Sequence, residues 1–195
     1  MIALIDYGAG NTASVANVLD ELKCEYVITN REGDLVSASK IIFPGVGEAS
    51  FAIKRLHMTN LFTMLRVNKK PILGICLGMQ LMCEKSKEGN VMGLCIFPVD
   101  TDKFDNTKVK VPHMGWNRVN HSKFSKLFAG IIDGEHFYFA NSYYVPVNEQ
   151  TTSICNYGVD FTASMEKENY YGVQFHPEKS GQAGIQLIKN FVELC

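Results

Sequence analysis

The sequence predicts an α/β fold in which helices flank a central, mostly parallel β-sheet that carries an added antiparallel portion. Three observations predict it. Short apolar runs alternate with helical patterns in the first half of the chain, Gly-rich turns follow several of these runs, and short strand-like runs joined by turns fill the region from residue 136 to residue 175. Alternating strands and helices are typical of a parallel sheet, whereas consecutive short strands are typical of antiparallel hairpins.

Composition limits the class of protein. With 195 residues, 46% of them hydrophobic, the chain can bury a full core, and we expect one domain over residues 1–195. The net charge of −1, from 19 basic and 20 acidic residues, favours neither nucleic acid nor a membrane as partner. No basic leader precedes the short apolar start, and no apolar stretch approaches the ~20 residues of a membrane span, so a cytoplasmic location is expected. The six cysteines form no C-x-x-C pair, and neither a metal site, a disulfide framework nor a cofactor is predicted.

The chain begins with a predicted strand, Ile2 to Asp6, followed by a Gly-rich turn and a helix with one apolar face. The pattern Gly8-x-Gly10-x-x-Ala13 in this turn matches the fingerprint of dinucleotide-binding proteins. A tight turn whose glycines only satisfy backbone geometry explains the same residues. We favour the tight turn, because a single match of this kind has frequent false positives.

A second Gly-rich turn, Pro44 to Gly47, follows predicted strands over residues 25–29 and 40–43. The glycines on both sides of Val46 allow the peptide plane to turn over with little penalty. This freedom is useful if a backbone N–H has to point at a developing oxyanion. An ordinary tight turn accounts for this stretch equally well.

The chemically most informative stretch is the short apolar run that ends at Cys76, between Gly74 and Gly78. Residues 72–75 are predicted to form a buried strand and residues 79–84 the first turns of a helix, which is the arrangement of a nucleophile elbow. The glycines permit a sharp, strained turn, and the free N–H groups and dipole of the helix favour the thiolate. The alternative is that Cys76 is a small buried hydrophobe, as we expect for most of the other cysteines.

A histidine and a carboxylate follow the last predicted strand, residues 170–175. A cysteine nucleophile needs an imidazole to exchange its proton and a carboxylate to orient that imidazole, and His176 and Glu178 supply both. They follow a strand end, at the sheet edge where α/β folds place their sites. Alternatively, His176 is a turn histidine and Glu178 a solvated charge near the final helix, which Ser180 is expected to cap.

Residues 111–117, Val-Pro-His-Met-Gly-Trp-Asn, contain the only tryptophan, Trp116. A tryptophan beside Pro and Gly is more typical of a shaped contact loop than of a core strand. The alternative is a buried core tryptophan.

Together these motifs resemble the class I (triad) glutamine amidotransferases, in residues 74–80 and in His176-Pro177-Glu178. Residues 111–117 and 172–180 are similar, more narrowly, to the glutaminase subunits of imidazole glycerol phosphate synthases. The resemblance runs from Asp6-Tyr7-Gly8 to the final helix. It implies a flavodoxin-like, class I amidotransferase-like sheet with the triad at its carboxyl edge.

The resemblance also implies roles for residues. Cys76 attacks the side-chain amide of L-glutamine, His176 acts as base and then as acid, and Glu178 orients the imidazole. The oxyanion donors are the backbone N–H groups of Leu77 and, after a peptide flip, Val46. The positions that match glutamine-holding residues are Gly47, Gln80, Glu88, Ser142 and Tyr143. The positions that match the partner face are Asn11, Trp116, Tyr138 and Lys179. The implied partner is a (βα)8-barrel cyclase of histidine biosynthesis, which receives ammonia through a sealed channel.

Two stretches depart from the family pattern: Asn141 stands where histidine is common, and Thr12-Ala13 stand where leucine and a basic residue are frequent. These departures leave open a paralogous glutaminase that supplies ammonia to another synthase, for example in surface-sugar assembly. A cysteine peptidase on a related fold and a nucleotide-binding module are the alternatives from other classes. Comparing the turnover of glutamine with that of peptides tests for a peptidase, and titration with NAD(H) tests for a nucleotide-binding module.

Overall fold

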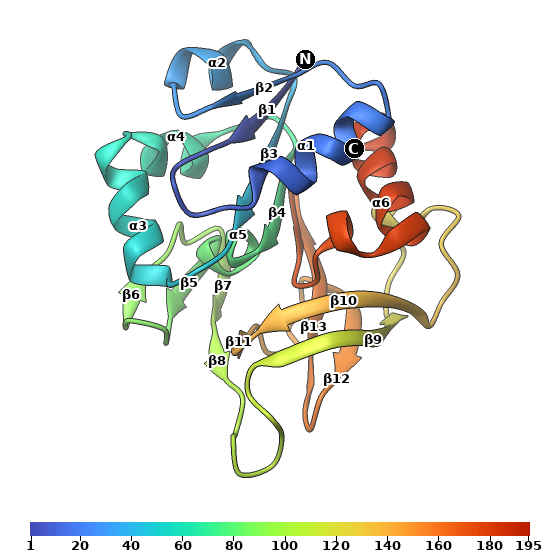
Figure 1. Cartoon of the computed structure of the whole chain (residues 1–195). Coiled ribbons are helices and arrows are strands. Elements are labelled where there is room, and N and C mark those ends of the chain that lie inside the picture. Colours follow the sequence, from blue (N-terminus) through green and yellow to red (C-terminus); the bar gives the residue numbers. More distant parts are fainter.

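The computed structural model describes all 195 residues and has a nine-stranded mixed sheet at its centre, in the order β10-β9-β12-β13-β14-β4-β3-β1-β2 (Figure 1). The five strands joined by parallel pairing are β1 (Ile2–Ile5), β2 (Tyr26–Thr29), β3 (Lys40–Gly45), β4 (Ile72–Cys76) and β14 (Tyr170–Val173). The antiparallel portion comprises β9 (His113–His121), β10 (Glu135–Asn141), β12 (Thr151–Asn156) and β13 (Asp160–Lys167). The predicted α/β fold is therefore confirmed.

Helices cover both faces of the parallel part, with α1 and α6 on one face and α3 and α4 on the other (Figure 1). The α-helices are α1 (Thr12–Glu21), α2 (Glu32–Ser37), α3 (Ala49–Met58), α4 (Leu61–Val67), α5 (Leu77–Leu81) and α6 (Gly181–Leu194), and the 3₁₀ helices are η1 (Lys126–Phe128) and η2 (Pro177–Lys179). Two small sheets complete the fold: β5 (Cys83–Ser86), β6 (Val91–Met92) and β7 (Phe97–Asp100) form one, and β8 (Asp102–Lys103) and β11 (Tyr143–Tyr144) the other. No helix has the length and apolar character that a membrane crossing requires.

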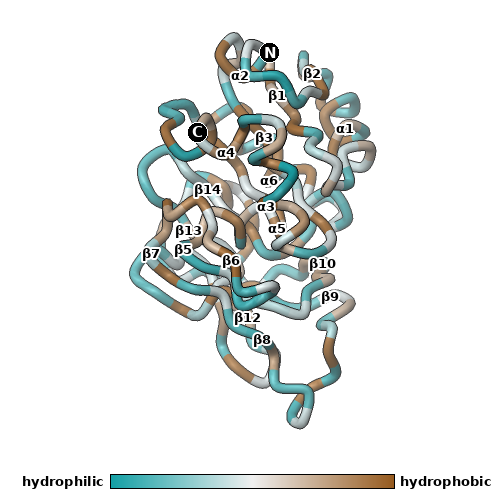
Figure 2. Tube along the Cα trace, turned by 90° about the vertical axis from the view of Figure 1, so that its left-hand side faces the viewer, coloured by the Kyte–Doolittle hydropathy of each residue, from teal (hydrophilic) through white to brown (hydrophobic).

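Successive residues of the central strands belong to two different hydrophobic cores. In β1, Ala3 and Ile5 pack into a cluster of 26 buried residues on the α3 and α4 side, whereas Ile2 and Leu4 pack into a cluster of 24 on the α1 and α6 side. Side chains alternate between the faces of a strand, so a strand covered on both sides is apolar throughout. In Figure 2 the loop that follows β8 alternates between hydrophilic and hydrophobic stretches.

Strand β14 joins the two portions of the sheet, because it pairs in parallel with β4 and antiparallel with β13. Its register sets Gly172 beside Gly74 and Val173 beside Ile75. The chain after Val173 therefore leaves the sheet at the edge where β4 ends in Cys76.

The structure differs from the expectation for residues 111–117. Residues from His113 on form β9, between β10 and β12, rather than a contact loop. The strand forms because β10 and β12 both pair with it, which a local pattern does not reveal. Trp116 is nevertheless 56% exposed, so it is not a core tryptophan.

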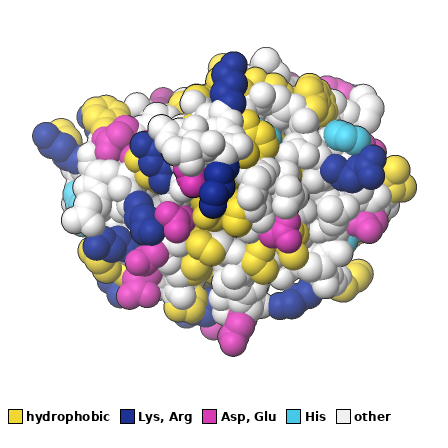
Figure 3. Space-filling view, turned by 90° about the horizontal axis from the view of Figure 1, so that it is seen from below, with side chains coloured by type: hydrophobic (Ala, Val, Ile, Leu, Met, Phe, Trp, Pro, Cys, Tyr) yellow, Lys and Arg dark blue, Asp and Glu magenta, His cyan; other side chains and the backbone are white.

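On the molecular face in Figure 3, acidic and basic side chains are interspersed, as the near-zero net charge leads one to expect.

Candidate active site

Cys76 ends β4 and immediately precedes α5, with φ 54° and ψ −111°. A non-glycine residue in this region carries backbone strain, on the order of 1–3 kcal/mol. The turn is also tightly packed: a Cβ on Gly78 would lie 1.9 Å from the carbonyl oxygen of Phe43, and a Cβ on Gly45 would lie 2.6 Å from the backbone nitrogen of Gly78. The strained turn expected around Cys76 is present, and glycine is required beside it.

The helix after Cys76 is shorter than the pattern predicts. It ends at Leu81, and β5 begins at Cys83, because the chain at residues 93 and 94 supplies donors to this segment: Leu94 N–H donates to Leu81 O (2.7 Å) and Gly93 N–H to Glu84 O (2.8 Å). A five-residue helix has a smaller dipole than the expected one. The Cys76 side chain occupies the N-cap position of this helix but makes no capping hydrogen bond.

Backbone and hydroxyl hydrogen bonds fix the position of His176. Its N–H donates to Tyr138 O (2.8 Å), which ties it to β10. The Ser180 hydroxyl donates to His176 O (2.6 Å) and accepts the Tyr138 N–H (3.0 Å). Ser180 occupies the N-cap position of α6, as expected, but its hydroxyl makes no capping hydrogen bond, because it holds His176 against β10 instead.

The His176 imidazole and the Glu178 carboxylate form a buried pair, with 2.8 Å between Nδ1 and Oε1. Their side chains are only 3% and 2% exposed. Burial by itself disfavours the charged imidazole, but the Cys76 thiolate and the Glu178 carboxylate outweigh it and raise the pKa of His176. This arrangement favours a protonated His176 imidazole at neutral pH. Because Nδ1 is engaged by Glu178, Nε2 is the ring nitrogen left to exchange a proton.

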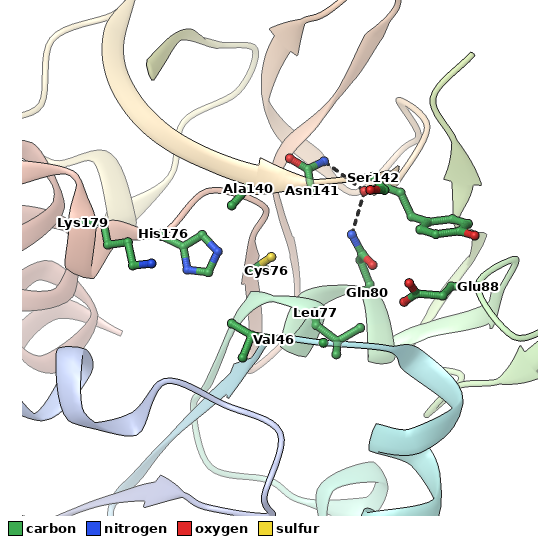
Figure 4. Close-up of a pocket in the computed structure, with 12 residues that line it drawn as sticks. Val46, Cys76, Leu77, Gln80, Glu88, Ala140, Asn141, Ser142, His176 and Lys179 are labelled. Carbon is green, nitrogen blue, oxygen red and sulfur yellow. Dashed lines mark hydrogen bonds between the residues drawn. The ribbon is translucent and has the colours of Figure 1, made fainter. Parts of the chain in front are cut away.

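Cys76 and His176 lie side by side in a pocket of about 250 Å³ (Figure 4). This volume is below the roughly 300–1,000 Å³ of pockets for drug-sized molecules, and it suits a smaller ligand. The lining residues come from the Gly-rich turn after β3, the elbow, the β5–β6 turn, the end of β10 and η2: Val46, Gly47, Cys76, Leu77, Gln80, Glu88, Ala140, Asn141, Ser142, Tyr143, His176 and Lys179.

The structure thus brings together the residues predicted for nucleophile, base, oxyanion site and substrate binding. Glu178 lies outside this lining and contacts the imidazole. Glu88 is half-buried, its carboxylate accepts the Ala49 N–H (2.9 Å), and burial raises its pKa. The Val46 N–H donates to Ala9 O, so it does not point into the pocket in this conformation.

Three of the four residues predicted for a partner face lie together beside the pocket. Tyr138 stands between Trp116, whose ring centroid is 6.2 Å away, and the Lys179 ammonium, 5.9 Å from the tyrosine ring. Lys179 also lines the pocket. Asn11 caps α1, because its Oδ1 accepts the Ser14 N–H (3.3 Å).

Sequence reasoning assigned no role to Gln174 and Ala140. Gln174 is fully buried and its amide nitrogen lies 3.6 Å from the Cys76 sulfur. The sequence signal that could have pointed to Gln174 is its position two residues before His176. Asn141, noted only as a departure from the family pattern, lines the pocket as well.

Comparison with known proteins defines the class. A family model described as glutamine amidotransferase class-I matches residues 3–195. A glutamine amidotransferase from Thermotoga maritima has the same fold, with a TM-score of 0.64 at 15% identity, over 98% of this chain and 82% of that one. The fold and the family match thus define a class I glutamine amidotransferase.

Relatives in sequence narrow the class. The imidazole glycerol phosphate synthase subunit HisH of Bacteroides fragilis (strain YCH46) is 49% identical over 195 residues, which is 99% of each chain. The protein of the same name from Escherichia coli K12 is 42% identical over 194 residues, again 99% of each. This chain belongs to the class I glutamine amidotransferase family and, within it, to the family of imidazole glycerol phosphate synthase subunits HisH.

Proposed function

We propose that the chain is the glutaminase subunit of an imidazole glycerol phosphate synthase. It hydrolyses L-glutamine to L-glutamate and ammonia and delivers the ammonia to a (βα)8-barrel cyclase subunit in histidine biosynthesis. The observation that carries the proposal is the strained Cys76 beside the buried His176–Glu178 pair, at a pocket fit for a small ligand. The names of the HisH relatives, each a subunit of that synthase, support the pathway.

In the first half of the reaction, the Cys76 thiolate attacks the side-chain carbonyl carbon of glutamine. The oxygen of the tetrahedral intermediate becomes an oxyanion, which the Leu77 N–H stabilises together with the Val46 N–H once that peptide has turned over. The His176 imidazolium gives its proton to the amide nitrogen, and the carbon–nitrogen bond breaks. Ammonia leaves, and a thioester joins Cys76 to the glutamyl group.

In the second half, the neutral His176 takes a proton from water, and the resulting hydroxide attacks the thioester carbon. The carbon–sulfur bond breaks, so that glutamate is released and the Cys76 thiolate returns. Glu178 holds the ring so that Nε2 faces the reacting atoms, and it stabilises the imidazolium in both halves.

Pocket residues outside the triad bind the substrate. Glu88 is suited to the α-ammonium group of glutamine, because burial raises its pKa and a bound cation offsets the cost of its charge. The remaining substrate contacts are assigned to Gly47, Gln80, Ser142 and Tyr143, which line the same pocket. The exposed Trp116, with Tyr138 and Lys179 beside it, is assigned to the face that meets the cyclase, as is Asn11.

The Cys76→Ser variant tests the proposal. The change is nearly isosteric, so the chain should fold and bind its cyclase, but a hydroxyl ionises far less readily than a thiol. We expect the complex to lose glutamine-dependent turnover and to retain turnover with ammonium salts. Normal glutamine-dependent turnover by the Cys76→Ser complex would rule out the nucleophile. Loss of both activities would point to a failed complex, which gel filtration detects.

A further inference from the structure

A buried side-chain amide lies directly against the proposed nucleophile. Gln174 follows β14, is fully buried, and is anchored by its backbone N–H to the carbonyl oxygen of Ala163 (2.8 Å). Its side-chain Nε2 is 3.6 Å from Cys76 Sγ, which is hydrogen-bonding range for sulfur. Its Oε1 is 2.9 Å from Nε2 of Gln80. The two glutamines therefore form a short chain of amides that ends at the sulfur.

A backbone carbonyl fixes the direction of this chain. The Gln80 Nε2 lies 2.8 Å from the carbonyl oxygen of Tyr143, and a carbonyl oxygen can only accept. The side-chain nitrogen of Gln80 must therefore be the atom that faces the Tyr143 carbonyl. The atom of Gln174 that meets this nitrogen must be its oxygen, and the other end of the Gln174 amide, which faces Cys76, must be the NH₂ group. Asn141 donates to the same carbonyl (2.9 Å), so both lone pairs of the Tyr143 oxygen are used.

An N–H donor aimed at sulfur acts differently on the two forms of a cysteine. A thiol sulfur is a weak acceptor, whereas a thiolate accepts a charge-assisted hydrogen bond that is roughly twice as strong as a neutral one. The contact is buried, which strengthens the interaction further.

We propose that Gln174 is a positioning residue that holds the Cys76 sulfur as a thiolate and aims it into the pocket, with Gln80 and the Tyr143 carbonyl fixing the donor. This inference rests on the proposed function, since it presupposes that Cys76 is the nucleophile. It also gives Gln80 a second role. Because its nitrogen is committed to Tyr143 and Gln174, only its oxygen is free to accept a hydrogen bond from a bound substrate.

The test uses a variant that removes the donor and keeps the shape. Gln174→Met preserves the length of the side chain and deletes the N–H. The matched control is Asn190→Leu on α6, which also deletes a buried amide, one that donates to the carbonyls of Leu127 and Ala129 and does not line the pocket. Alkylation of the full chain by iodoacetamide is followed from pH 5 to pH 10, and the modified cysteine is identified by peptide mapping. Cys95, which is exposed, serves as the internal reference.

In the parent chain we expect Cys76 to be alkylated faster than Cys95 at neutral pH. In Gln174→Met we expect Cys76 alkylation to slow by about tenfold or more at neutral pH, and to approach the parent rate at the highest pH, where the thiolate forms without help. Cys95 should react as before. Asn190→Leu should lower the unfolding midpoint and leave the Cys76 profile in place.

If the rate of Cys76 alkylation depends on pH in the same way in Gln174→Met as in the parent chain, the inference is overturned and the proposed function stays intact. A parent chain in which Cys76 is no more reactive than Cys95 would instead count against the nucleophile itself. If Gln174→Met is poorly soluble, Gln174→Leu gives the same comparison, because it also removes the donor. A slowing that is equal at every pH would indicate a packing defect and would also contradict the inference.

Discussion

The backbone N–H of Val46 donates a hydrogen bond to the carbonyl oxygen of Ala9, with 3.2 Å between nitrogen and oxygen. Val46 lines the pocket, yet its amide is engaged by the first Gly-rich turn and does not face Cys76. To become an oxyanion donor, the Gly45–Val46 peptide has to turn over, and Gly47, already at φ +97°, is a residue that tolerates such a change. We therefore expect the isolated chain to rest in a state with one of its two oxyanion donors missing.

The triad residues should differ in what they contribute. His176→Ala removes proton transfer, a contribution of typically ~10²- to 10⁴-fold, whereas Glu178→Gln keeps a hydrogen-bonding side chain that stabilises the imidazolium less well. We expect both variants to lower kcat for glutamine, with His176→Ala affected at least as severely. Steady-state glutaminase assays of the stimulated complex measure this. Hydrolysis by His176→Ala at the parent rate would exclude the Cys–His pair.

Gly78, in the first turn of α5, should be irreplaceable because a side chain there has no room. A Cβ on Gly78 would lie 1.9 Å from the carbonyl oxygen of Phe43, which is backbone and cannot move aside, so Gly78→Ala should destabilise the chain by about 3 kcal/mol or more. Gly33→Ala on α2 is the matched control, because its Cβ would meet nothing within 4 Å. That variant should gain about 0.4–1 kcal/mol. Urea unfolding compares the two, and equal stabilities would contradict the packing of the elbow.

Buried His113 should make stability depend on pH. Burial lowers its pKa from 6.5 to about 4. Between these values the unfolded chain binds more protons than the folded chain, so this contribution is complete above pH 6.5 and is lost as the pH falls to about 4. A shift of this size corresponds to about 3 kcal/mol.

The His113→Phe variant isolates that contribution. The ring stacks on Tyr157 at 3.9 Å and on Phe139 at 4.9 Å, which phenylalanine can also do. We expect the free energy of unfolding of the parent to fall more steeply between pH 6.5 and pH 4 than that of the variant. Parallel curves in urea unfolding would show that His113 does not titrate in this window.

Exposed aromatic residues allow a test of the proposed partner face. Trp116 is 56% exposed and lies beside Tyr138 and the pocket, whereas Phe124 is 89% exposed and belongs to the segment after β9. Trp116→Ala should weaken stimulation by the cyclase and leave the unstimulated glutaminase rate unchanged. Phe124→Ala should alter neither. Each variant is titrated with the cyclase while glutamate release is measured. Equal stimulation of the two variants would show that Trp116 does not contribute to the interface.

Much of the fold and of the triad could be predicted because the signals are local. The elbow is encoded by two glycines around Cys76, and the pairing of His176 with Glu178 needs only two residues of separation. The early end of α5 at Leu81 could not be predicted, since the groups that bind Leu81 O and Glu84 O arrive from residues 93 and 94.

Contacts across the sheet explain the other differences. The strand that carries Trp116 depends on two pairing partners distant in sequence. The hydroxyl of Ser180 bonds to His176 and β10 instead of capping α6. Gln174 lies inside a recognisable motif, but its contact with Cys76 exists only because β14 pairs with β4. Each of these features depends on the three-dimensional fold, which spacing along the chain does not report.

Gating by the Val46 peptide is tested by measuring glutaminase turnover of the chain alone and then in complex with a (βα)8-barrel cyclase that carries its own ligand. Because one oxyanion donor is worth roughly 3–4 kcal/mol, or ~10²- to 10³-fold in rate, partner binding that turns the Gly45–Val46 peptide should raise kcat by about that factor. We predict that the free chain is slow and that the complex is strongly stimulated. A free chain that is already fully active, and that no bound cyclase accelerates, would contradict the gating by Val46 and identify a stand-alone hydrolase.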